Sequence, residues 1–190
     1  NYERLIANPA VRRVNFTGST HVGRIVGELS ARHLKPALLE LGGKAPLLVL
    51  NDADLDAAVE AAAFGAYFNQ GQICMSTERL IVDTSVADAF VERLSAKIAT
   101  LRAGDPANGD SVLGSLVDAS AGQRIKGLID DALGKGAKLV AGGQLDGSIL
   151  QPTLLDNVTA DMRLYREESF GPVAVLLRGD GDEALLRLAN

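Results

Sequence analysis

The chain has 190 residues, of which 47% are hydrophobic, 23% charged and 4% aromatic, and its formal net charge is −5. These proportions are typical of a soluble globular protein with one core or with parts of two domains. Nucleic acid is disfavoured as a partner, because Lys and Arg do not cluster as a nucleic-acid-binding surface requires. A membrane-spanning segment is disfavoured as well, because the longest apolar stretches are too short to cross a bilayer.

The first predicted strand covers residues 11–16, and a helix follows at about residues 20–34, where apolar side chains recur at helical spacing. The connection between them is a strand-to-helix turn whose free backbone N–H groups suit a phosphate. Gly18 allows a tight turn, Ser19 offers a hydroxyl donor, and Gly23 lets another backbone or a ligand come close. Their spacing fits neither the usual dinucleotide fingerprint nor a P-loop, so an ordinary capped turn remains the alternative.

A short apolar run at residues 37–40 ends in Glu40, after Pro36 has stopped the preceding helix. Ligands in open α/β sheets gather beyond the carboxyl ends of strands, so Glu40 is a candidate general base. The alternative is a solvated carboxylate that pairs with Lys44 or Arg79. The following pair, Gly42-Gly43, is the best candidate for a domain boundary, because glycine gives the chain freedom to pass between domains.

A second apolar run at residues 46–50 precedes an Ala-rich helix at residues 55–69, for which residues 51–54 offer N-cap oxygens. Cys74 follows at or just after the end of that helix. A free cysteine is usually a small buried hydrophobe, and this remains the alternative. The flanking Gly71 and polar residues instead favour a loop thiol, which nearby cations or helix N-termini would activate.

The alternation of strands and helices continues to the end of the chain. Further strands are predicted at residues 80–82, 137–140, 151–155 and 172–177, and further helices at residues 86–101, 119–135 and 183–190. One face of the first of these helices carries Ala89, Phe90, Leu94 and Ile98, and residues 104–111 form a loop. This alternation predicts an α/β fold with a mostly parallel sheet flanked by helices.

The last candidate motif is Glu167-Glu168-Ser169-Phe170-Gly171-Pro172, just before the final predicted strand. Two carboxylates, an aromatic ring and a Gly-Pro turn can line a pocket, and a solvated charge pair is the alternative. We expect no metal site, because the chain has one Cys, no paired His and no calcium-binding loop. The lone cysteine cannot form an intramolecular disulfide, so the cytoplasm is the expected location.

Four motifs occur in an order that resembles the aldehyde dehydrogenase superfamily: Phe16-Thr17-Gly18-Ser19, Glu40-Leu41-Gly42-Gly43-Lys44, Gly71-Gln72-Ile73-Cys74 and Glu168-Ser169-Phe170-Gly171-Pro172. The similarity extends across essentially the whole chain. It implies an aldehyde dehydrogenase-like fold, in which residues 1–42 end a Rossmann-like NAD-binding domain. Residues 43–190 would then form a catalytic domain that is truncated at its C-terminus.

The resemblance also implies the residues of a site. Cys74 matches the catalytic thiol, which adds to an aldehyde and passes through a thiohemiacetal to a thioester. Glu40 matches the base that activates water for hydrolysis, and its presence favours a free carboxylic acid over transfer to coenzyme A. Backbone N–H groups near Cys74 would hold the oxyanion. The residues that match the family's cofactor contacts are Gly18, Ser19, Gly23, Leu41, Glu168 and Phe170.

Residues 71–79 resemble more narrowly the bacterial salicylaldehyde, benzaldehyde and vanillin dehydrogenases. The implied substrate is a small aromatic aldehyde, with salicylaldehyde as the single best expectation. NAD is the expected cofactor and NADP stays open, since the deciding residues lie upstream in the family. The parent protein is expected to be a homo-oligomer.

Three other readings stay open: a non-catalytic nucleotide-binding or structural relative, a generic Rossmann-like domain with a buried Cys, and a dehydrogenase for aliphatic aldehydes. Chains of the family are longer than this one. Their adenosine-binding strands, oxyanion-hole Asn, ribose-binding Lys, final catalytic segment and oligomerisation strands have no counterpart here. We therefore expect a fragment of a longer protein, and we expect these 190 residues alone to be inactive or nearly so.

Overall fold

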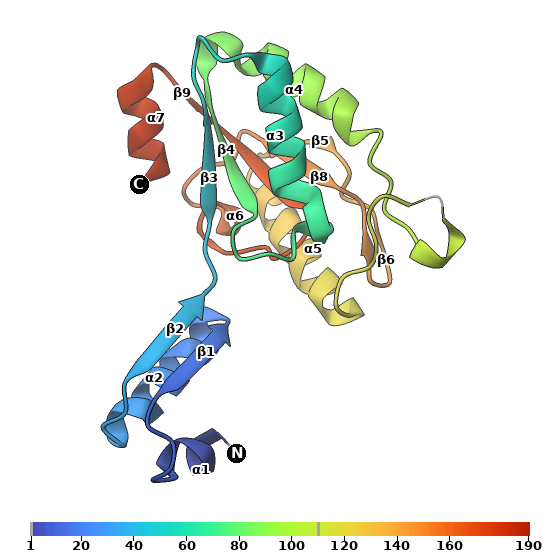
Figure 1. The fold of residues 1–190 in the computed structure, drawn as a ribbon. Helices are drawn as coiled ribbons and strands as arrows, with labels where there is room; N and C mark the ends of the chain where they lie inside the picture. The colour runs from blue at the N-terminus through green and yellow to red at the C-terminus, as the bar shows by residue number, and fades with distance from the viewer. Residues whose placement is uncertain (1, 110) are drawn as a thin grey trace. The chain divides into compact units, whose positions relative to one another are not determined.

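The computed structural model describes residues 2–109 and 111–190, so Asp110 of the loop predicted at residues 104–111 lies outside the described residues. The chain divides into two compact units, Asn1–Gly43 and Lys44–Asn190 (Figure 1). The division falls directly after the second glycine of the Gly42-Gly43 pair. Each unit is described by itself.

The first unit is one strand–helix–strand motif preceded by a short helix. Its elements are α1 (Tyr2–Ala7), β1 (Val14–Gly18), α2 (Thr20–Arg32) and β2 (Ala37–Leu41). The two strands pair in parallel, with Gly18 of β1 opposite Leu41 of β2. Helix α2 packs closely on β2, because a Cβ atom at Gly23 would overlap the side chain of Leu41.

The second unit contains a five-stranded sheet in the order β3-β4-β9-β8-β5. These strands are β3 (Ala45–Val49), β4 (Thr77–Asp83), β9 (Val173–Gly179), β8 (Thr153–Asp156) and β5 (Lys138–Ala141). All neighbours are parallel except β5 and β8, which are antiparallel. A small hairpin, β6 (Leu145–Asp146) with β7 (Ile149–Leu150), lies outside this sheet.

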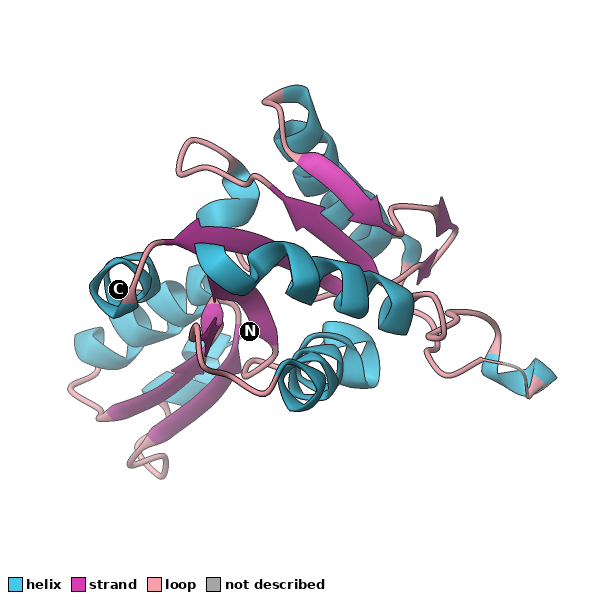
Figure 2. Ribbon diagram, turned by 90° about the horizontal axis from the view of Figure 1, so that it is seen from above, coloured by secondary structure: helices cyan, strands magenta, loops and turns pink. Residues whose placement is uncertain are grey.

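Helices cover both faces of that sheet (Figure 2). They are α3 (Leu55–Tyr67), α4 (Thr84–Ile98), α5 (Ala119–Gly134), α6 (Arg163–Arg166) and α7 (Asp182–Ala189), with 3-10 turns at Phe68–Gly71 and Pro106–Asn108. Helices α3 and α4 pack on the face that carries Leu80 and Leu176, whereas α5, α6 and α7 pack on the face that carries Ile81 and Val175. Alternate residues of β4 and β9 therefore serve two separate cores.

The expected α/β fold with a mostly parallel sheet is thus confirmed, whereas the buried face expected for the helix at residues 86–101 is partly wrong. Helix α4 begins at Thr84, and the residue that joins Phe90, Leu94 and Ile98 on its buried face is Ala87, whereas Ala89 is exposed. Positions 87, 90, 94 and 98 are three and four residues apart, and Ala89 is out of phase with them.

Within the described residues, no helix has the length and apolarity to cross a membrane.

Candidate active site

In the first unit, the carboxyl ends of β1 and β2 bring four of the predicted site residues to one edge. Parallel register places Thr17 opposite Glu40 and Gly18 opposite Leu41. Helix α2 begins two residues after Gly18, with Ser19 as its N-cap. Glu40 is exposed and Leu41 is half-buried. Ligands of open α/β sheets bind at this kind of edge.

The N-terminus of α2 has the features of an anion site. The Ser19 hydroxyl accepts a hydrogen bond from Val22 N at 3.3 Å, and no acidic residue occupies the first turn. The remaining first-turn N–H groups and the helix dipole favour a phosphate. Gly23 is buried and contributes by letting α2 approach Leu41, so its small size serves helix–strand packing. The start of α2 is therefore suited to bind an anionic group such as a phosphate.

In the second unit, Cys74 lies on the segment from Phe68 to Ser76, which we call the Cys74 loop. Helix α3 ends at Tyr67, and three consecutive residues, Asn69, Gln70 and Gly71, then have positive φ angles of 51°, 57° and 66°. Such backbone is strained for residues with a Cβ atom. A Cβ atom at Gly71 would overlap the carbonyl group of Gly171, so the Cys74 loop directly contacts the last predicted motif, Glu167–Pro172.

Cys74 occupies a central position of a turn that is closed by a hydrogen bond from Ser76 N to Ile73 O at 2.9 Å. The closing bond of such a turn does not use the N–H groups of its central residues, which stay suited to hold an oxyanion. The Cys74 side chain is exposed, so the alternative of a buried core cysteine is wrong. Gln72 anchors the loop, since its side chain accepts from Val117 N at 2.9 Å.

The segment Ser169–Gly171 faces the Cys74 loop through Gly171. Phe170 has a φ angle of +47° and is 39% exposed, whereas Ser169 is fully buried. Arg124 of α5 donates to the carbonyl oxygens of Glu168 at 3.2 Å and of Ser169 at 2.5 Å. The preceding Glu167 pairs with Arg163 at 2.8 Å, and this hydrogen bond lowers the pKa of Glu167.

Glu78 and Lys44 form a buried ion pair that was not expected from the sequence. Glu78, on β4, is 3% exposed and pairs with the Lys44 ammonium group. Its carboxylate also accepts from Ser169 N at 3.0 and 2.9 Å and from Phe170 N at 3.3 Å. Burial lowers the pKa of Lys44, an effect that the Glu78 carboxylate opposes. The available signal was strand alternation, which places Glu78 on the same face of β4 as the buried Leu80.

Lys44 and Arg79, the two cations that a solvated Glu40 was expected to pair with, form interactions with other groups. Lys44 pairs with Glu78. Arg79 donates to the carbonyl oxygens of Lys44, Leu188 and Ala189, each at 2.9 Å. Glu40 belongs to the first unit and Cys74 to the second. The structure thus brings Gly18, Ser19, Glu40 and Leu41 together in one unit, and Cys74, Glu168 and Phe170 together in the other.

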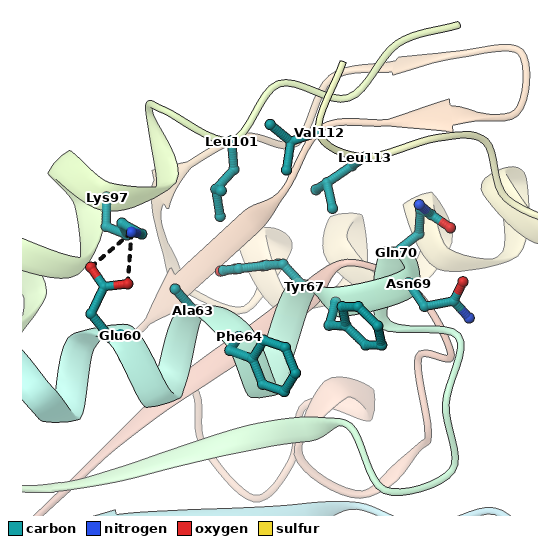
Figure 3. Close-up of a pocket in the computed structure, with 11 residues that line it drawn as sticks. Glu60, Ala63, Phe64, Tyr67, Asn69, Gln70, Lys97, Leu101, Val112 and Leu113 are labelled. Carbon is teal, nitrogen blue, oxygen red and sulfur yellow. Dashed lines mark hydrogen bonds and ion pairs between the residues drawn. The ribbon is translucent and has the colours of Figure 1, made fainter. Parts of the chain in front are cut away.

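A pocket of about 450 Å³ lies next to the start of the Cys74 loop (Figure 3). Its lining includes the stacked rings of Phe64 and Phe68, whose centroids are 4.9 Å apart, and the Glu60–Lys97 ion pair. Tyr67 also contributes, and its hydroxyl group donates to Thr153 O at 3.1 Å. The pocket is mainly apolar and aromatic, which suits a small hydrophobic ligand. Within the described residues, no cluster of His, Cys, Asp and Glu could hold a metal ion.

Comparison with known proteins identifies the relatives of this chain. The model of the aldehyde dehydrogenase family matches residues 2–190. A vanillin dehydrogenase of Pseudomonas fluorescens is 86% identical over 188 residues, which are 99% of this chain and 39% of that protein. A salicylaldehyde dehydrogenase of Pseudomonas putida is 53% identical over 189 residues, again 99% of this chain and 39% of that protein.

Among solved structures, that of a salicylaldehyde dehydrogenase from Pseudomonas putida G7 complexed with salicylaldehyde superposes with a TM-score of 0.96 at 52% identity. The match covers 100% of this chain and 39% of that chain. The present chain therefore spans about two fifths of the length of the relatives that it matches.

Proposed function

The chain belongs to the aldehyde dehydrogenase family, and from this premise we propose that it is part of a longer enzyme that oxidises an aromatic aldehyde to the carboxylic acid. The observation that carries the proposal is Cys74. It is an exposed thiol on a turn, and its loop abuts the Ser169–Gly171 segment through Gly71.

The reaction begins at the sulfur atom of Cys74. The thiolate forms a bond to the carbonyl carbon, and the π electron pair moves to the oxygen atom, which gives a tetrahedral thiohemiacetal oxyanion. The N–H groups of the central residues of the Ile73–Ser76 turn are suited to donate hydrogen bonds to this oxyanion. The exposed position of Cys74 gives an incoming aldehyde access to the sulfur.

Oxidation of the thiohemiacetal requires a hydride acceptor. The family uses NAD or NADP, and the nicotinamide ring supplies this acceptor when the dinucleotide is bound. We assign its pyrophosphate to Gly18, Ser19 and the N-terminus of α2, with Gly23 and Leu41 as the packed support. We assign its nicotinamide end to Glu168 and Phe170. NAD is the proposed cofactor, as expected from the sequence.

Hydrolysis completes the cycle and is the proposed task of Glu40. A thioester on Cys74 is released when water attacks its carbonyl carbon, and the sulfur then leaves as the thiolate. A carboxylate that takes the proton of that water makes the attack faster. Glu40, at the carboxyl end of β2, is the residue of the first unit that we assign to this role.

Vanillin ranks ahead of salicylaldehyde as the proposed substrate. Salicylaldehyde was the best expectation from the sequence, but the relative at 86% identity is a vanillin dehydrogenase, whereas the salicylaldehyde dehydrogenase is 53% identical. The stacked rings of Phe64, on α3, and of Phe68, the first residue of the Cys74 loop, are compatible with an aromatic ligand. Aliphatic aldehydes are the alternative that a substrate panel decides.

The test uses the full-length protein that carries this chain, with NAD and a panel of vanillin, salicylaldehyde, benzaldehyde and butanal. We expect kcat/KM to be highest for an aromatic aldehyde, and we expect Cys74→Ser to lower it by at least about 10³-fold, because a hydroxyl is a far weaker nucleophile. The variant should still bind NAD in a calorimetric titration. Aromatic aldehydes that give no NADH, or a Cys74→Ser variant with normal turnover, would contradict the proposal.

A further inference from the structure

We propose that Glu78 is a positioning residue, whose buried carboxylate holds the main chain of Ser169 and Phe170 in place and thereby fixes where Glu168 and Phe170 meet the dinucleotide. The inference rests on the proposed function, because it assigns a task within the same site. In this proposal Glu78 acts through these residues and touches neither the thiol nor the cofactor.

The first argument is the hydrogen bonding of the carboxylate. Ser169 N donates to both of its oxygen atoms, at 3.0 and 2.9 Å, and Phe170 N donates to one of them at 3.3 Å. The side chains of Glu78 and Lys44 are 4% and 10% exposed, so both charges are withdrawn from water. A buried carboxylate persists only where donors and a counter-charge satisfy it. The two backbone amides and the ammonium group meet that requirement here.

The second argument is that two residues that flank Cys74 in the sequence, Gly71 before it and Glu78 after it, both contact the Ser169–Gly171 segment. Gly71 is three residues before Cys74 and abuts Gly171, and Glu78 is four residues after it and binds Ser169 and Phe170. The chain carrying the thiol is therefore attached to the segment carrying Phe170 at two points. A change in either attachment alters the position of Phe170 relative to the sulfur atom.

The third argument is backbone strain. Phe170 has a φ angle of +47°, a conformation that is disfavoured for a residue with a Cβ atom. Such a conformation persists only when its surroundings enforce it. Glu78 binds the N–H groups of this segment, and Arg124 binds the carbonyl groups of Glu168 and Ser169. Hydrogen bonds to a charged partner are about twice as strong as neutral ones, which explains a carboxylate at position 78.

The test compares Glu78→Gln with the wild type in the full-length protein, with Glu183→Gln as a matched control on an exposed face of α7. Glutamine keeps the shape of the side chain but replaces one acceptor oxygen by a donor. The hydrogen bonds from Ser169 N and Phe170 N therefore weaken. We expect the KM for NAD to rise about tenfold, the KM for vanillin to change less than about twofold and kcat to fall less than about threefold. Hydrogen exchange at Ser169 and Phe170 should become about tenfold faster.

Glu78→Asp is the second variant, since it keeps the charge and shortens the side chain, and it should show the same selective rise in the KM for NAD. The proposal is overturned if both variants lose thermal stability while the KM for NAD and the exchange of the two amides stay unchanged. If the wild-type protein oxidises no aromatic aldehyde, the proposed function fails, yet the exchange rates in Glu78→Gln still decide whether Glu78 holds this segment.

Discussion

Gly71 is a residue for which both backbone conformation and packing demand glycine. Its φ angle is +66°, and a Cβ atom there would overlap the carbonyl group of Gly171. The neighbouring Asn69 and Gln70 share the left-handed conformation, although each carries a side chain. Because Gly171 is held through the main chain of its own segment, the overlap cannot be relieved by turning a side chain.

We therefore expect Gly71→Ala to destabilise the full-length protein by about 3 kcal/mol, from the overlap and the disfavoured backbone angle together. Gly127→Ala is the control, because Gly127 lies within α5 and nothing lies within 4 Å of its missing Cβ atom. Alanine there should raise stability by about 0.5–1 kcal/mol. Thermal denaturation measures both changes, and an unaltered midpoint for Gly71→Ala would contradict the argument.

At the scale of single residues, the sequence identified residues that stand in a local motif. It did not identify residues whose role depends on contacts with positions far away in the chain. Cys74 could be placed on a loop, because Gly71 and polar residues precede it. Glu78 could not be linked to Ser169, since 91 residues separate them in the chain. The local sequence suggested Glu40 as a partner of Lys44, whereas Lys44 pairs with Glu78, which is 34 residues away in the chain.

At the scale of elements, N-cap oxygens were expected for two of the four longest helices, at Ser19 for α2 and within residues 51–54 for α3, whereas the starts of α4 and α5 were predicted without a cap. Ser19, Asp54, Asp83 and Asp118 accept hydrogen bonds from first-turn N–H groups of α2, α3, α4 and α5. The elements that escaped prediction are short, namely α1, α6 and the hairpin of β6 and β7. Segments of two to six residues show too little periodicity for a hydrophobic pattern to identify them.

Asp83 links the start of helix α4 to the start of helix α7. Its carboxylate accepts from the Ser85 side chain at 2.6 Å and from Ser85 N at 2.9 Å at the start of α4, and from Gly181 N at 3.0 Å at the start of α7. The hydrogen bonds from Ser85, followed by that from Gly181, lower the pKa of Asp83 in the folded protein. A lowered pKa means that the folded state favours the ionised carboxylate.

The stabilisation from Asp83 is therefore fully present above the pKa of an unfolded Asp, about 3.9, and is lost as the pH falls through the lower folded value. Asp83→Asn should lower the melting temperature at pH 7, and the gap to the wild type should narrow as the pH falls below about 4. Asp52→Asn, at an exposed turn, is the control. A gap that stays constant from pH 7 to pH 3 would show that the carboxylate charge has no part in joining α4 and α7.

At the scale of the whole molecule, the two units differ greatly in their cores. In the described part of the first unit, the buried apolar side chains are Ile6 and Val26, whereas the second unit buries residues on both faces of a five-stranded sheet. A two-stranded sheet with one packed helix is marginal by itself. Relatives of this chain are about two and a half times as long, since it spans 39% of them. We therefore expect the first unit to be only marginally stable by itself.

This difference predicts how the isolated 190-residue chain behaves. Amides of β1, β2 and α2 should exchange with solvent at least about 100-fold faster than those of β4 and β9, because weakly packed elements open at a small fraction of the global free energy. Gly18, Ser19 and Glu40, proposed for the cofactor and the hydrolytic water, lie in that weak unit, so turnover with NAD and vanillin should stay below about 1% of the full-length rate. Equal protection in both units, or robust turnover, would show that the first unit folds and works without the missing segments.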